Sequence, residues 1–348
     1  MKIKIRILSF LLLVSLNLVG AESKVTIEKD DAKKIRAINE TVQSGANLSL
    51  EKFKALKIKI DKSKDPLNLN DKIRFMAYCN NEGIYQERVD KLLFEMINKN
   101  PKNDFFMFNK TSIYDYPSID NLKSKATNLW LDKVNNSPKD YDLLWCAANF
   151  FKTVDPKSSV KFLEKGKKLD KNNLKWYKAL GECYYIVNNG KLAYENFKFV
   201  YDNEDKNSLQ KIMLLGDLTR TAYISKNYFA AKKYAMLAIK NSYIKTSYGV
   251  INNTDLYFIG NTVLGLIALK NNDIEEASKY LIKSVDKTVF PKMNLAKELF
   301  NKGEKKVVIS FLKKCSLFWD KKMCEKWIKK IKSNKTPDFK YYVEPYLN

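Results

Sequence analysis

The chain has 348 residues, a formal net charge of +24 at pH 7 and no histidine. It therefore lacks the residue that most hydrolytic triads use as a base and that many zinc sites use as a ligand. It also has no Walker-type or glycine-rich phosphate loop. We predict no catalytic residue, no cofactor and no metal, and one alternative stays open: a catalytic site built from carboxylates alone, since two acids can come from any part of the chain.

The first residues have the pattern of a secretory signal peptide. Lys2, Lys4 and Arg6 precede an apolar run at residues 7–19, and Val19 and Ala21 occupy the two positions that a signal peptidase reads. We expect cleavage after Ala21, so that residues 1–21 are removed and the mature chain is exported to the periplasm or the cell exterior. A membrane-spanning helix is the alternative, but such a helix needs about 20 apolar residues.

Two helical patterns follow, one at residues 32–42 and one at residues 50–60. In both, apolar residues return at helical spacing. We expect residues 22–70 to form an N-terminal helical segment or cap.

A repeated pattern of small and apolar residues begins near residue 71. It is clearest where Gly265 and Ala268 mark one helix, residues 271–273 form a polar turn, and Ala277 and Leu281 mark a second helix. Such a pair cannot bury both faces alone and must stack on similar neighbours. Small or β-branched markers of the second helices recur at intervals of 31 to 46 residues, at Val89, Ala126, Ser159, Ala193, Ala231, Ala277 and Val308.

The pattern predicts an all-α fold in which residues 71–316 form at least six consecutive antiparallel helix pairs. We expect Ala193, Ala231 and Ala277 to be buried where helices cross, because small residues permit close approach. The longest marker interval, between Ala231 and Ala277, predicts an insertion at about residues 241–255. One first helix is degraded near residues 114–117, and Pro101 and Pro138 should follow the ends of second helices.

The residues Tyr177, Leu180, Gly181, Tyr184, Ala193 and Phe197, together with Leu264, Gly265, Ala268, Ala277 and Leu281, resemble tetratricopeptide repeats. The resemblance implies a right-handed α-solenoid with a concave groove that binds peptides or protein segments. Residues 293–299, with residues 337–339, also resemble the closing segment of many bacterial repeat proteins. The set of lysine, asparagine and arginine residues that forms the family's peptide-terminus clamp is not found here.

The face of each first helix that points away from its partner helix would line such a groove. Aromatic and basic residues gather on this face, which suits a partner with an acidic, partly apolar segment. The alternative is that the aromatic residues pack against the next repeat. The predicted groove residues are Arg74, Tyr78, Phe151, Lys175, Lys178, Tyr185, Arg220, Tyr223, Lys297 and Phe300.

Two non-enzymatic functions are compatible with this pattern. The first is a scaffold or adaptor in the bacterial envelope that binds a protein or peptide segment in the groove. The second is a lysine-rich module that attaches to an anionic membrane or cell-wall polymer. The lysine excess also fits the bias of an AT-rich genome, since the lysines are spread along the chain. We expect no nucleic-acid partner and no small-molecule substrate.

The five cysteines are Cys79, Cys146, Cys183, Cys315 and Cys324, and their spacing matches no metal motif. The first three lie in apolar helical runs, where a buried thiol is expected. Cys315 and Cys324 lie close enough in sequence for a disulfide in an oxidising compartment.

Residues 317–348 contain a last amphipathic pattern. Trp319, Met323, Trp327 and Ile331 recur every four residues, with lysines on the other faces. We expect a capping helix and tail that cover the apolar side of the last repeat. The alternative is a helix that lies on an anionic membrane.

Overall fold

The computed structural model describes residues 29–62, 68–108, 119–206, 208–246, 249–285, 291–344 and 346–347. The predicted signal peptide, residues 1–21, and the degraded helix at residues 114–117 lie outside this described part. Within it the fold is all-α apart from one short hairpin, and consecutive helices pack against one another as in a helical repeat protein.

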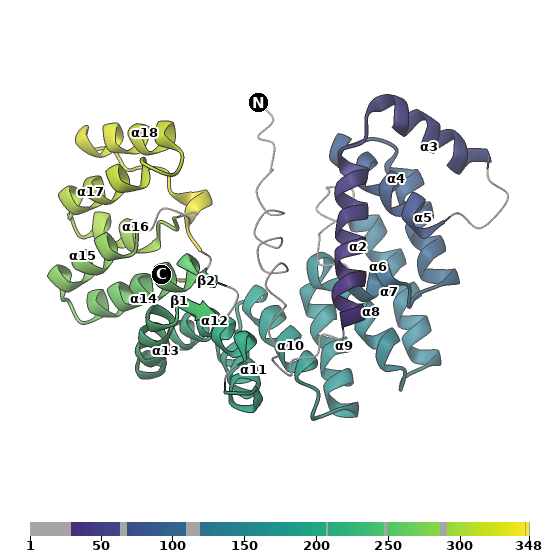
Figure 1. Ribbon diagram of the computed structural model, residues 1–348, viewed down its shortest axis with the longest axis horizontal. Coiled ribbons are helices and arrows are strands. Elements are labelled where there is room, and N and C mark those ends of the chain that lie inside the picture. Colours follow the sequence, from purple (N-terminus) through teal and green to yellow (C-terminus); the bar gives the residue numbers. More distant parts are fainter. Residues whose placement is uncertain are drawn as a thin grey trace. The chain divides into compact units, whose positions relative to one another are not determined.

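The chain divides into two compact units, of which the first contains the helices before residue 188. Here α4 packs on α5, α8 on α9 and α9 on α10, while α2 runs along α4 and α6 (Figure 1). The bounds of its helices are α2 Lys29–Ala46, α3 Leu50–Lys62, α4 Leu69–Glu82, α5 Gln86–Lys99, α6 Asp104–Phe108, α7 Ile119–Asn136, α8 Tyr141–Val154, α9 Pro156–Leu169 and α10 Leu174–Ile186.

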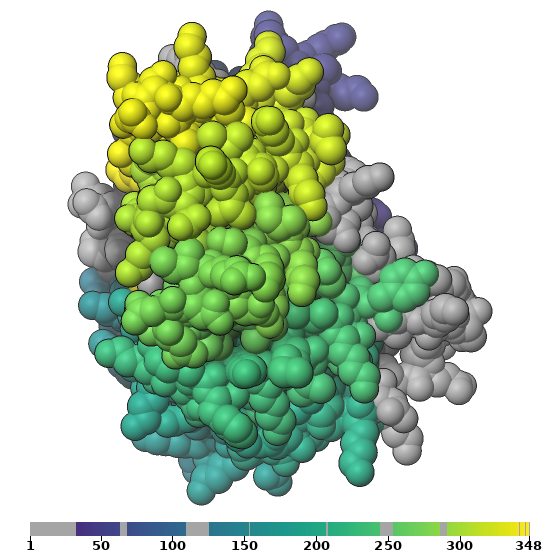
Figure 2. Space-filling view, turned by 90° about the vertical axis from the view of Figure 1, so that its left-hand side faces the viewer, coloured from purple at the N-terminus to yellow at the C-terminus, as the bar shows by residue number. Residues whose placement is uncertain are grey.

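In the second unit, helices from α11 onward stack in chain order. Figure 2 shows this order as bands that change from green to yellow across one face of the unit. The elements are α11 Gly190–Asn203, α12 Leu209–Ile224, α13 Tyr228–Lys240, β1 Tyr243–Thr246, β2 Gly249–Asn252, α14 Thr254–Lys270, α15 Ile274–Lys283, α16 Asn294–Asn301, α17 Lys305–Cys315, α18 Lys321–Lys332 and the short 3-10 helix η1 Lys340–Tyr342.

The predicted repeat register is confirmed by the marker residues. Each of the seven lies in a second helix, from α5 to α17, and each is buried; Ala193, Ala231 and Ala277 are 0% exposed. The helices α5 and α7 end at Lys99 and Asn136, before the two prolines. The predicted pair at residues 177–200 corresponds to α10 and α11, and the division between the two units falls between them.

Side-chain caps explain how the turns between paired helices stay short. The side chains of Asn189, Asn227 and Asp273 accept hydrogen bonds from the backbone N–H groups of Leu192, Ala230 and Glu276. Each cap satisfies a donor that the first turn of a helix leaves free. A second helix therefore begins within a few residues of the end of the first.

The predicted insertion at residues 241–255 contains a two-stranded antiparallel hairpin, which the sequence pattern did not predict. Strand β1 pairs with β2, with Ile244 opposite Ile251 and Lys245 opposite Val250. Each strand has four residues. Strands this short offer too few alternations for a period of two to stand out from helical periodicity.

Candidate functional site

Three of the ten predicted groove residues are part of the core, so their assignment to an open groove was wrong. Tyr78 is 8% exposed, Phe151 is 0% exposed and Tyr223 is 4% exposed. The ring of Tyr78 stacks on Phe53 of α3, with 4.0 Å between centroids. Large aromatic side chains fill the space between neighbouring helices, because burying them contributes more than leaving them in water.

In the first unit, the N-terminal helix α2 covers the face of α4 that was predicted to line a groove. The Nε–H group of Arg74 donates to Ser44 Oγ at 3.2 Å. A Cβ on Gly45 would lie 2.6 Å from Arg74 Cα, so the two backbones approach too closely for any other residue. Ile38 and Val42 of α2 belong to the apolar core. In this structure α2 therefore packs on α4 as part of the core.

On α10 the predicted groove residues Lys175, Lys178 and Tyr185 are partly exposed. The ammonium of Lys175 lies 5.2 Å from the ring centroid of Trp145 and 5.1 Å from that of Trp176. A lysine over an aromatic face is held by attraction to the ring electrons. The ammonium of Lys175 therefore lies beside two indoles, while the residue stays partly exposed.

In the second unit, Arg220 of α12 pairs with a glutamate near the C-terminus of the same chain. The polypeptide after α18 turns at η1 and returns alongside α16 (Figure 1). Along this tail, Glu344 places Oε1 2.7 Å from Arg220 Nε, and the two side chains are 14% and 24% exposed. An ion pair shielded to this degree is less screened than one in open solvent.

Asn294, the first residue of α16, holds the backbone of the same tail. Its Nδ2 donates to the carbonyl oxygens of Glu344 at 2.9 Å and Leu347 at 2.8 Å, and its Oδ1 accepts from the N–H of Glu344 at 2.8 Å. The N–H of Met293 donates to the carbonyl of Tyr342 at 2.7 Å. Asn294 is 1% exposed. Its buried amide is satisfied by polypeptide backbone, as a buried polar group requires.

Aromatic contacts anchor the start of the tail on α18. Trp327, which is 1% exposed, has its ring centroid 4.9 Å from that of Phe339 and 5.2 Å from that of Tyr342. Trp319 also meets Tyr342, at 5.1 Å. Trp327 and Ile331, from the predicted apolar stripe, are thus buried within the protein.

Charges of both signs meet where the tail passes α14. The pKa of Asp255 is raised, first because surrounding protein displaces part of its solvent and also because Glu344 lies near; Arg220 and Lys292 act in the opposite direction. Asp255 itself remains exposed. Asp217 Oδ1 also lies 3.6 Å from a terminal nitrogen of Arg220. The carboxylates of Glu344, Asp255 and Asp217 therefore share the field of this guanidinium, which weakens the hold of Arg220 on Glu344 relative to an isolated pair.

Two predicted groove residues, Lys297 and Phe300, lie on α16, the helix that begins at Asn294. Both are partly exposed, and Lys297 stands one turn after Asn294. Residues one turn apart share a helix face. Of the predicted groove residues in this unit, Arg220 contacts the tail directly.

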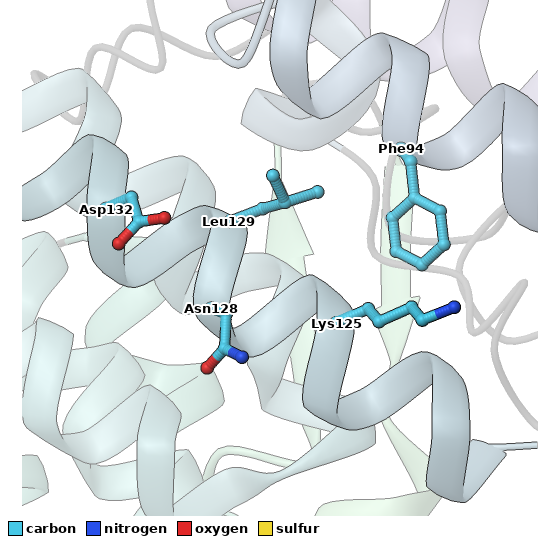
Figure 3. A pocket seen from close by; sticks show the side chains of 5 residues that line it. All are labelled: Phe94, Lys125, Asn128, Leu129 and Asp132. Atoms are coloured by element: carbon cyan, nitrogen blue, oxygen red, sulfur yellow. The ribbon is translucent and has the colours of Figure 1, made fainter.

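A separate shallow depression lies between α5 and α7 in the first unit (Figure 3). Its volume is about 300 Å³. Phe94 faces it from α5, while Lys125, Asn128, Leu129 and Asp132 face it from α7. Only Phe94 and Leu129 give it an apolar surface. Its two charged residues, Lys125 and Asp132, are exposed.

Asn294 and Glu344 were missed as functional residues by sequence reasoning. Asn294 lies in residues 293–299, which with residues 337–339 were identified by their resemblance to the closing segment of bacterial repeat proteins. Nothing around Asn294 or Glu344 signals that one binds the other across some 50 residues.

In the described residues no cluster of cysteine, aspartate and glutamate is arranged to hold a metal ion.

All five cysteines are buried free thiols, including Cys315 and Cys324, which were considered for a disulfide. Burial raises the pKa of Cys324 to about 11 and also raises that of Cys315. A thiol with so high a pKa is a poor nucleophile at neutral pH, because the thiolate is the reactive form.

The burial of Tyr223 in the core can be tested by mutation. Among the described residues its hydroxyl has no hydrogen-bond partner, so Tyr223→Phe should raise the free energy of unfolding by about 1 kcal/mol. Burial raises the pKa of Tyr223. The neutral ring is favoured in the fold, and the stability it provides is present below the unfolded pKa of about 10 and is lost above it.

Urea titrations at several pH values would measure both effects. Between about pH 9 and 11 the Phe variant should lose less unfolding free energy than the wild type. Parallel losses in the two proteins would mean that Tyr223 ionises freely and is not part of the core.

No protein-family model matches this chain, and no curated protein matches it. None of the described helices has both the length and the apolar character needed to cross a membrane.

Proposed function

We propose that this protein is an exported, non-enzymatic scaffold with tetratricopeptide-like repeats that binds a protein or peptide segment on its first helices. In this proposal the helix pairs form a right-handed solenoid, and α18 closes its C-terminal end. The signal-peptide pattern of residues 1–21 supports a place in the bacterial envelope. The function rests on the site and not on the fold alone, because helical repeats carry many functions.

One observation carries the proposal. Arg220, a residue predicted from sequence to bind an acidic segment, lies 2.7 Å from a glutamate on a returning stretch of polypeptide. Asn294 holds the backbone of that same stretch. The first helices of the second unit therefore offer hydrogen-bonding groups for the main chain of a peptide, from Asn294, and a cation for a carboxylate, from Arg220.

Site-specific photo-crosslinking tests this function. A photo-reactive amino acid at Lys297, whose side chain is 40% exposed, should crosslink a protein partner in the native envelope fraction. The matched control is Phe229 on the second helix α13, which is 86% exposed and should give no crosslink. Crosslinks from Phe229 but not from Lys297 would move the binding face to the second helices and would refute the proposal.

The alternative, attachment to an anionic membrane or cell-wall polymer, is distinguished by salt. Binding through many lysines weakens steeply as salt rises, whereas a peptide held by main-chain hydrogen bonds and one ion pair weakens modestly. The burial of Trp327 and Ile331 supports the cap over the membrane alternative, because a helix on a lipid interface presents its apolar side outward.

A further inference from the structure

The two ends of the chain cover first helices in different ways. Helix α2 is attached to α4 by apolar packing and a close backbone approach at Gly45. The tail, described at residues 342–344 and 346–347, is attached to α12 and α16 through hydrogen bonds and an ion pair. Packing of Tyr342 on Trp319 and Trp327 and burial of Leu347 add to these polar contacts. Polar contacts of this kind can be exchanged for equivalent ones from another molecule, because their net contribution over water is small.

The tail's contacts define what the site recognises. Asn294 offers two donors and an acceptor, and these bind the N–H and C=O of Glu344 and the C=O of Leu347. Such contacts recognise the main-chain groups of an extended or turning segment and do not depend on its side chains. Arg220 adds one requirement, a carboxylate two residues after the carbonyl that accepts from Met293. The buried amide of Asn294 needs an occupant, since an unpaired buried amide is costly.

The tail is also an imperfect occupant. Its carboxylate atom Glu344 Oε2 is buried without a hydrogen-bond partner among the described residues. Asp255 lies close enough for Glu344 to raise its pKa, so a second negative charge opposes the first. A ligand that places its carboxylate with both oxygens paired would bind better than the tail does.

We infer that Arg220, Met293 and Asn294 form a binding site for a main-chain segment of a partner protein that carries a carboxylate, and that the chain's own tail, through Tyr342, Glu344 and Leu347, occupies this site in competition with it. The inference rests on the proposed function and names its ligand class. A tethered segment acts at an effective concentration in the millimolar range. The partner's apparent affinity is therefore lowered by the fraction of molecules in which the tail is bound.

A labelled peptide with the sequence of residues 342–348 serves as the probe, and fluorescence anisotropy on full-length chains measures its affinity. The wild type should bind it weakly, because its own tail competes. The Glu344→Gln chain should bind it at least about tenfold more tightly, since loss of one charge-assisted contact costs the tail that much. A peptide in which Glu344 is replaced by Gln should bind the Glu344→Gln chain about tenfold more weakly than the native peptide.

Two variants serve as controls: one changes the binding site itself, and the other changes a residue far from it in the chain. Asn294→Asp keeps the acceptor atom but replaces both donors, and in the Glu344→Gln background it should abolish peptide binding. Lys168→Ala, at an exposed site on α9 in the other unit, should change nothing. Circular dichroism checks that each chain is folded, and hydrogen exchange at the amides of Met293 and Glu344 reports on the tail directly.

Equal affinity of the peptide for the wild-type and Glu344→Gln chains would overturn the inference, as would a Gln peptide that binds as well as the native one. Faster exchange in Glu344→Gln without any peptide binding would also overturn it, since the tail would then be a structural element only. In each of these cases the Lys297 crosslink to a partner can still form, so the proposed function would survive. If the peptide binds tightly but no crosslink forms from Lys297, the proposed function is refuted, while the peptide-binding site itself remains supported.

Discussion

Replacing Trp176 with alanine is expected to lower the free energy of unfolding by about 3–5 kcal/mol. The indole of Trp176, on α10, is 0% exposed and meets Trp145 at right angles, with 5.3 Å between ring centroids. Gly166 of α9 lies directly against it: a Cβ at Gly166 would be 2.5 Å from the ring. Removing the indole leaves a cavity that the close-packed helices cannot fill.

The same contact can be tested from the other side. Gly166→Ala should cost about 1–3 kcal/mol by overpacking. The double variant should cost less than the sum of the two, because the cavity left by Trp176 accommodates the new methyl group. Urea titration of all three variants, followed by circular dichroism, measures the coupling.

Lys168→Ala, an exposed site on the same helix α9, is the control and should stay within about 0.5 kcal/mol of the wild type. Additive costs for Gly166→Ala and Trp176→Ala would show that the helices do not approach each other at this point.

Much of the fold follows from the sequence because helix packing imposes a local rule. Where two helices cross closely, a small residue is needed, and where a gap opens, an aromatic residue fills it. Ala193, Ala231 and Ala277 show the first part of the rule, and the register they gave was confirmed along the whole series of second helices.

The site could be predicted only in part, because it depends on contacts between residues far apart in sequence. Arg220 was identified from its position on a first helix. Its partner Glu344 is more than a hundred residues away, and no periodicity links the two. Tyr78, Phe151 and Tyr223 were misplaced for a related reason: helical spacing gives the side of a helix, but it does not say whether another segment covers that side.

Both units have a terminal segment over their first helices, and this could not be read from the repeats. Ser44 of α2 binds Arg74, and Glu344 of the tail binds Arg220. In each case a basic residue predicted to receive a partner receives part of its own chain instead. A repeat pattern describes how neighbouring units pack, and it contains no information about segments outside the pattern.

Deleting residues 319–348 is expected to have the largest effect on the protein. The truncation removes the buried side chains of Cys324, Trp327, Ile331, Phe339 and Leu347. It also exposes the side of α17 against which α18 packs and leaves the amide of Asn294 without its tail partners. Each large apolar side chain contributes about 1.5–3 kcal/mol, so the melting temperature should fall by more than about 10 °C, with aggregation in the absence of lipid.

The matched control keeps the helix and removes its charge. Lys321, Lys326 and Lys329 are exposed on α18, and their replacement by Gln should leave the melting temperature within about 2 °C of the wild type. If α18 is a membrane anchor instead of a cap, the results reverse: the Gln variant loses binding to anionic liposomes, and the truncated chain stays stable and monomeric. Because Trp327 packs against Phe339 and Tyr342, we expect the cap, and a stable truncated chain would refute it.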